Sequence, residues 1–161
     1  MKLAGWVTEG TWPACVDAAR DLIGSQPAEV TLIHVREGGR PAPEQGFGSL
    51  IGRGRRQRAE DQLRQLSEDA ASQMLDQAAQ RLGLPATQRL ETGLPERVVT
   101  AASAEVDYLI LGRDGDRSRL GPNSLGRHTR FVIDHAPCRV LLIWPGVAPS
   151  IGSIPPPPAD R

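Results

Sequence analysis

Short apolar runs alternate along this chain with segments of helical periodicity. The runs at residues 29–35 (EVTLIHV), 108–112 (YLILG) and 139–144 (RVLLIW) are nearly continuous, which is typical of strands buried on both faces. Strands that alternate with helices form parallel sheets covered by helices on both faces. Right-handed crossovers leave few arrangements, all of them doubly wound. We therefore predict a three-layer α/β fold.

Two more strands are expected, at residues 3–8 and 86–91. Helices are expected at 11–24, 58–82, 95–104 and 129–134. In the long helix, apolar residues recur at three- and four-residue steps, so we expect one stripe of buried side chains. The stripe consists of Leu63, Leu66, Ala70, Met74, Ala78 and Leu82. Residues 36–57 are rich in Gly, Pro and Arg without a period, which predicts a long loop.

Composition limits the classes of function. A chain of 161 residues with 39% hydrophobic residues fits one globular domain. The formal net charge is zero, which predicts neither nucleic acid nor a membrane as a partner. No apolar run approaches the ~20 residues that span a bilayer. No signal peptide is recognisable and the two cysteines form no disulfide framework, so we expect a cytoplasmic protein.

The C-terminal end differs from the rest. We expect one domain at residues 1–145 and a proline-rich tail at 146–161, which is disordered or extended because residues 155–158 are all proline. Lys2 is the only lysine, and no Gly-Lys-Ser/Thr occurs, which excludes a Walker-type phosphate loop. The sequence also offers no nucleophile with a partner, so we assign no catalytic residue and expect no enzyme, with weak nucleotide hydrolysis left open.

Three glycines frame the loop after the strand at 108–112. Gly112 ends that strand, Gly115 follows after two residues, and Gly126 stands where the next helix begins. Glycines let the backbone approach a ligand closely, and unpaired amides at a helix start favour an anion. Spaced glycines are also common in plain turns. The loop is net basic, although its charges could pair with one another, and these charges are Arg113, Asp114, Asp116, Arg117, Arg119, Arg127 and Arg130.

The order of strand, Gly-x-x-Gly, loop, Gly at a helix start, His135-Ala136-Pro137-Cys138 and apolar strand closely resembles universal stress proteins. The opening turn at residues 9–11 and the Gly-Leu-Pro at residues 93–95 also match, so the resemblance spans about residues 3–144. It implies an open five-stranded parallel sheet of order 3-2-1-4-5. It further implies homodimers formed through the last strand, residues 139–144.

The resemblance also implies a ligand, namely ATP or another adenine nucleotide such as AMP or ADP, while a metal stays open. Gly112, Gly115 and Gly126 match the phosphate-binding glycines, with Arg113 and Arg127 beside them, and Val35 lies where adenine contacts are expected. Three departures stand out. The spacer at 116–125 has ten residues instead of nine, Arg127 replaces a Ser or Thr, and Thr8 and Glu9 occupy the place of an aspartate.

Two functions remain. The first is a small regulatory module that binds an adenine nucleotide through the glycine loop. The alternative is a dimeric interaction protein of the same fold that binds no nucleotide. His128, at the junction between the loop and the helix, could approach a phosphate, although a structural histidine is the commoner case.

Overall fold

The computed structural model describes residues 1–38 and 50–157 of the chain. The strands are β1 (Lys2–Trp6), β2 (Glu29–Glu37), β3 (Ala86–Gly93), β4 (Tyr108–Gly112) and β5 (Arg139–Ile143). The α-helices are α1 (Trp12–Ile23), α2 (Leu50–Leu82), α3 (Pro95–Ser103) and α4 (Arg127–His135). Single turns of 3-10 helix occur at Pro122–Ser124 and Ile151–Ser153. Strands and helices thus alternate as the sequence predicts.

The sheet is parallel and has the order β3-β2-β1-β4-β5, which confirms the predicted topology. β1 lies in the middle, because the chain builds the sheet in one direction through β2 and β3 and then returns to add β4 and β5 on the other side. The reversal leaves a gap between the carboxyl ends of β1 and β4. In open α/β sheets this gap is where ligands bind.

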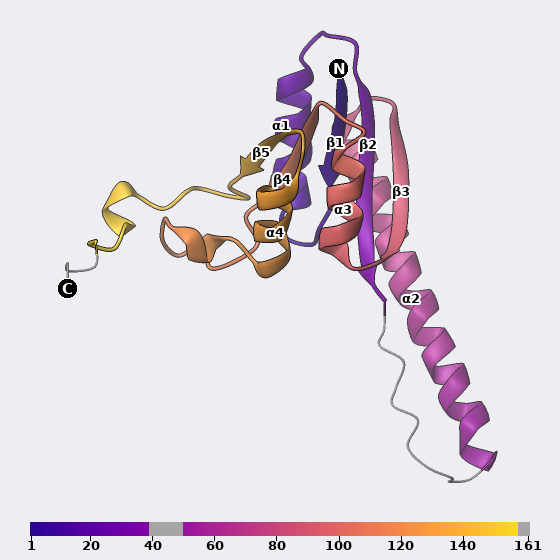
Figure 1. Ribbon diagram of the computed structural model, residues 1–161. Coiled ribbons are helices and arrows are strands. Elements are labelled where there is room, and N and C mark those ends of the chain that lie inside the picture. The colour runs from indigo at the N-terminus through magenta and orange to yellow at the C-terminus, as the bar shows by residue number, and fades with distance from the viewer. Residues whose placement is uncertain (39–49, 158–161) are drawn as a thin grey trace.

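Helices cover both faces of the sheet (Figure 1). On one face, α1 and α2 bury a core that includes Val16, Ile23 and Leu75 together with Leu32 and Ile110 of the sheet. The other face is covered by α3 and α4, whose Val99 and Val132 pack on Leu109 and Leu111. Near-complete burial of both faces explains why the strands of the sheet centre read as continuous apolar runs.

The predicted loop at residues 36–57 is wrong at both of its ends. β2 continues to Glu37, and α2 begins at Leu50 rather than at residue 58; the middle of the predicted loop, residues 39–49, lies outside the described residues. β2 extends to Glu37 because it pairs with β3 up to its last residue, from Val30↔Ala86 to Glu37↔Gly93. Such pairing is set by the neighbouring strand, so the local composition of residues 36–37 did not reveal it.

The predicted buried stripe of α2 is also wrong in its first half. Leu63 and Leu66 are 67% and 66% exposed, whereas the buried residues are Ala71, Leu75, Ala78 and Leu82. A helix of 33 residues is ~50 Å long and a strand of nine residues ~30 Å, so α2 outruns the sheet. Its first half therefore projects beyond the carboxyl edge, as Figure 1 shows. The predicted end is confirmed, with Gly83 in the left-handed region at a φ of 67°.

Beyond β5, residues 146–157 lead away from the sheet on the side of the glycine loop (Figure 1). The backbone N–H of Leu120 donates to Oγ of Ser153 at 3.0 Å, which ties the tail to that loop. Val147 and Ile151 are 100% and 80% exposed. Among the described helices, none has the length and apolar character that a membrane span requires.

Candidate functional site

The β1–α1 turn closes over the end of β4. Thr8 accepts hydrogen bonds from the backbone N–H groups of Thr11 (3.3 Å) and Trp12 (3.1 Å), and the two threonine hydroxyls contact each other. A Cβ on Gly112 would lie 2.5 Å from Cβ of Thr11, which is far closer than real contacts. Gly112 therefore belongs at the gap between β1 and β4, and only a residue without a side chain lets the turn approach β4 so closely.

Gly115 packs against the backbone of its own loop. A Cβ at this position would lie 2.3 Å from the carbonyl oxygen of Asn123. The backbone N–H of Gly115 donates to the carbonyl of Ser124 at 3.0 Å, and that of Asp116 donates to Asn123 at 2.8 Å. These two amides are thus used within the loop, in contrast to the expectation that loop amides face an anion.

Gly126 marks the start of α4, and an acidic side chain of the chain itself sits there. The backbone N–H of Gly126 donates to Oδ1 of Asp114 at 2.7 Å, and a Cβ on Gly126 would meet the same carboxylate at 2.8 Å. A carboxylate at a helix N-terminus is favoured by the orphan amides and the helix dipole. Asp114 thus places a negative charge at one of the positions predicted for phosphate.

Arg113 connects the glycine loop to the end of β5. Its backbone N–H donates to the carbonyl of Ile143 at 2.9 Å, and its guanidinium lies over the ring of Trp144, 4.7 Å from the centroid. The guanidinium also donates to the hydroxyl of Ser124, which is fully buried. The side chain therefore ties the glycine loop to the end of β5, and its Nε is buried without a partner among the described residues.

Val35 lies on β2, which β1 separates from β4 and the glycine loop. The N–H of Val7 donates to the carbonyl of Ile33 at 2.7 Å, and alternate residues of a parallel strand face the same neighbour, so the backbone of Val35 also faces the β1 side. However, β1 ends at Trp6, and the carbonyl of Val7 is instead contacted by Nδ1 of His34 at 2.7 Å. The amide and carbonyl of Val35 thus face the gap beyond β1.

Arg127 and His128, in the first turn of α4, face α3. They line a hollow of about 540 Å³ together with Glu37, Gly38 and the residues 93–95. Nδ1 of His128 contacts Glu96 at 2.6 Å and Nε2 contacts Glu37 at 3.2 Å. The pKa of Glu96 is lowered, first by a hydrogen bond from its own backbone and then by His128, with Arg127 adding to the effect. His128 is therefore held between two carboxylates.

The structure gathers the three glycines but separates the two arginines: Arg113 points to β5 and Arg127 to the hollow beside α3. The sequence did not reveal that Asp114 contacts Gly126 or that Glu96 contacts His128. Asp114 lies twelve residues before Gly126, the N-cap residue of α4. N-capping side chains usually bond to amides two or three residues further along the chain, so the sequence around Asp114 contains no capping pattern. No cluster of three metal-ligating side chains occurs within residues 1–38 and 50–157.

Comparison with known proteins defines the class. Residues 11–143 match the model of the Universal stress protein family. Solved structures with a similar fold include universal stress protein UspA from Lactobacillus plantarum, which has a TM-score of 0.59 and 19% identity and covers 89% of this chain and 97% of its own. No curated protein matches the sequence.

Two further structures of universal stress proteins contain nucleotides. One is in complex with cAMP, with a TM-score of 0.62, 14% identity and coverage of 91% of this chain and 98% of its own. The other, from Archaeoglobus fulgidus, is in complex with dAMP, with a TM-score of 0.57, 16% identity and coverage of 88% and 96%. These likenesses show a shared doubly wound α/β fold, and the family model defines the class as universal stress proteins. The chain belongs to the universal stress protein family.

Proposed function

We propose that this chain is a small regulatory module that binds an adenine nucleotide, ATP, AMP or ADP, at the carboxyl edge of the sheet between β1 and β4. The observation that carries the proposal is the place of Gly112 at the reversal of strand order, with Gly115 and Gly126 close together in the loop that follows and with the backbone of Val35 on the other side of β1. Relatives of the same family are known in complex with cAMP and dAMP, which supports the same ligand class.

In this proposal, the base contacts the amide and carbonyl of Val35, which face the gap beyond β1. The phosphates lie against the loop between β4 and α4. Asp114 holds the N–H of Gly126 in the absence of a nucleotide, so phosphate and carboxylate compete for the start of α4. We expect the protein to act in the cytoplasm, where free thiols such as those of Cys15 and Cys138 stay reduced.

Removing the charge of Asp114 should strengthen nucleotide binding. We expect ATP or AMP to raise the melting temperature of the wild-type protein, because a ligand of the native state stabilises it by mass action. In Asp114→Asn the side chain still reaches Gly126, but the negative charge is gone. Because hydrogen bonds to charged groups contribute ~1.5–3 kcal/mol, we expect an affinity about tenfold higher, measured by calorimetric titration.

The matched control is Asp116→Asn in the same loop. Asp116 accepts a hydrogen bond from the N–H of Ser118 at 3.0 Å and does not touch Gly126. Asp116→Asn removes the same charge from the same loop. Comparing the two variants therefore separates the loss of competition at Gly126 from the general effect of a less negative loop. Failure of both nucleotides to raise the melting temperature of wild type and of Asp114→Asn would contradict the proposal.

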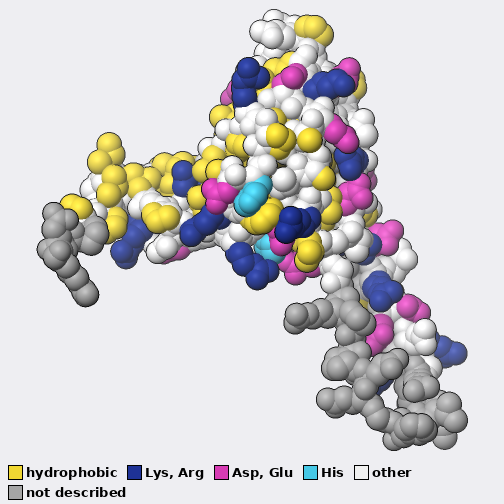
Figure 2. Space-filling view, viewed as in Figure 1, with side chains coloured by type: hydrophobic (Ala, Val, Ile, Leu, Met, Phe, Trp, Pro, Cys, Tyr) yellow, Lys and Arg dark blue, Asp and Glu magenta, His cyan; other side chains and the backbone are white. Residues whose placement is uncertain are grey.

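A specific observation favours the second candidate, a dimeric interaction protein. β5 is an edge strand whose residues 140–143 are only half-buried although all are apolar. The tail beside it exposes Val147, Ile151 and Ile154, and Figure 2 shows hydrophobic side chains on this projection. An open apolar edge is a template for pairing with another chain. A second copy paired along residues 139–144 would cover it by an isologous contact.

The dimer can be tested independently of any nucleotide. We expect light scattering of the full chain at micromolar concentration to give twice the monomer mass. The expected cause is the pairing of two β5 edges, so a cysteine in place of Val140 should form a cross-link between subunits with a short bifunctional thiol reagent. Cys15 is buried and its pKa is raised to about 12 by burial, so it should react little, and the partly exposed Cys138 is replaced by serine in this variant and in its control, which keeps Val140. A monomeric mass would contradict this candidate.

A further inference from the structure

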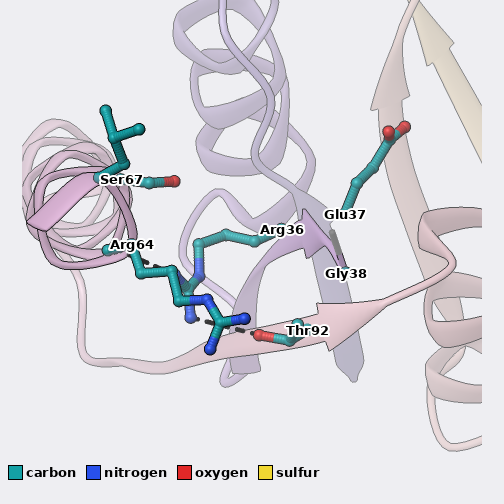
Figure 3. Close-up of a pocket in the computed structure, with 7 residues that line it drawn as sticks. Arg36, Glu37, Gly38, Arg64, Ser67 and Thr92 are labelled. Carbon is teal, nitrogen blue, oxygen red and sulfur yellow. Dashed lines mark hydrogen bonds between the residues drawn. The ribbon is translucent and has the colours of Figure 1, made fainter. Parts of the chain in front are cut away.

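A second hollow lies on the other side of β2, between α2 and the ends of β2 and β3. Its volume is about 530 Å³, and we name it the Arg36–Arg64 hollow. The residues that line it are Arg36, Glu37, Gly38, Leu63, Arg64, Ser67 and Thr92. It therefore lies at the carboxyl edge of the parallel sheet but is not lined by any residue of the glycine loop. Figure 3 shows this hollow from close by.

Arg36 is held in the hollow by weak contacts. Its guanidinium approaches the carbonyl of Arg64 at 3.5 Å, Glu68 at 3.4 Å and the hydroxyl of Thr92 at 3.3 Å. Charge-assisted hydrogen bonds are normally 2.7–2.9 Å long. The pair between Arg81 and Asp17 in the same molecule meets this standard at 2.8 and 2.7 Å. The protein thus places the guanidinium of Arg36 without satisfying it.

The polar groups of the hollow converge. In Figure 3, Arg36, Arg64 and Ser67 extend toward the space between α2 and the sheet, with Thr92 on its floor. The nearest acidic side chain on β2, Glu37, turns away from them and contacts Nε2 of His128 at 3.2 Å. Among the described residues, Glu68 supplies the only carboxylate that pairs with Arg36. Between the two arginines, therefore, two guanidinium groups face one loosely paired carboxylate, because the carboxylate of Glu37, although this residue lines the hollow, is directed toward His128.

We infer that the Arg36–Arg64 hollow is an anion site that binds a phosphate group. A carboxylate has two oxygens and would satisfy one guanidinium fork. A phosphate has enough oxygens to accept hydrogen bonds from both arginines and from the hydroxyls of Ser67 and Thr92. The site joins the projecting half of α2 to the sheet, because Arg64 and Ser67 come from α2 and the other polar groups from β2 and β3. It is distinct from the proposed nucleotide site.

The probe for this site is inorganic phosphate, titrated into the full chain and followed by calorimetry, with chloride at the same ionic strength as the reference. We expect saturable binding with a millimolar dissociation constant. Arg64→Gln should weaken it about tenfold, since it removes a charge-assisted contact. The control Arg58→Gln removes the same charge from the same helix outside the hollow and should leave the binding unchanged.

A variant that binds phosphate more tightly distinguishes a ligand site from an arginine, Arg36, that serves only the structure. Glu68→Gln removes the carboxylate that competes for Arg36, so phosphate should bind about tenfold more tightly. Absence of saturable binding, equal loss in Arg64→Gln and Arg58→Gln, or no gain in Glu68→Gln would each overturn the inference. Arg64 and Glu68 lie far from the glycine loop in the sequence and do not line it, so the effects of these two variants are distinguishable from a failure of nucleotide binding.

A second titration identifies the source of the phosphate group. AMP and adenosine are added to the phosphate-loaded Gly115→Val variant, in which the proposed nucleotide site is disrupted, so that only the hollow is tested. Displacement of phosphate by AMP but not by adenosine supports a phosphate ester as the ligand, and no displacement by AMP supports free phosphate. Displacement by adenosine as well would overturn the inference, because it would show that the base, and not the phosphate group, fills the hollow.

Discussion

Gly115→Val is expected to abolish any nucleotide effect on the melting temperature. Even the first carbon of the new side chain would lie 2.3 Å from the carbonyl oxygen of Asn123 and 2.8 Å from the backbone of Ser124. Backbone atoms cannot yield as a flexible side chain does, so the loop has to move and its glycines separate. The measurement is the shift of the melting temperature with ATP or AMP, compared with wild type.

The control for Gly115→Val is Gly146→Val. No atom lies within 4 Å of the position of its Cβ, so the same change in side chain meets no obstacle there. We expect this variant to keep the nucleotide effect. A circular dichroism spectrum of each variant shows whether the sheet and helices persist. If Gly115→Val keeps its fold and still responds fully to nucleotide, the glycine loop is not the phosphate site.

Two leucines of α2 should differ sharply in their contribution to stability. Leu75 is 2% exposed and packs in the core, and Leu66 is 66% exposed on the projecting half. Leu75→Ala should lower the free energy of unfolding by about 2–5 kcal/mol, because it removes buried methyl groups and leaves a cavity. Leu66→Ala should change it by less than ~0.5 kcal/mol. Urea unfolding of both variants measures the difference.

The same helix serves as its own control here, since both variants make the same chemical change. Equal losses in Leu66→Ala and Leu75→Ala would mean that the first half of α2 is covered by something as well packed as the sheet. That result would contradict the exposed position of Leu66.

The parallel, doubly wound architecture could be predicted because each central strand is buried on both faces, whereas the order of the strands followed from the resemblance to universal stress proteins. Leu109, Ile110 and Leu111 illustrate this, as all three are at most 1% exposed and form a continuous apolar run in the sequence. The buried face of α2 could not be predicted in full. Periodicity shows which residues share a helix face, but the end of the sheet decides which part of that face is covered.

Only part of the site could be predicted, for a related reason. Gly112, Gly115 and Gly126 are recognisable because glycine at a strand end and at a helix start has a distinct backbone meaning. Asp114 carries no such mark. Its role depends on the fold of the ten-residue spacer, which brings the aspartate back to the start of α4. The hollow beside α2 depends in the same way on residues far apart in the sequence, such as Arg36 and Arg64.

The length of α2 has a consequence for local stability. Residues 71–82 can open only if the core opens, whereas residues 54–70 are held by helical hydrogen bonds and by the long contacts of Arg36 with Arg64 and Glu68, and can unwind with little loss of burial. Amide hydrogens should therefore exchange with solvent much faster in the first half of the helix than in the second. Arg64 and Ser67 lie near the border between these halves, so an anion held there would slow exchange along the exposed turns. Binding in the Arg36–Arg64 hollow would thereby lower the local unfolding of the first turns of α2, far from the sheet.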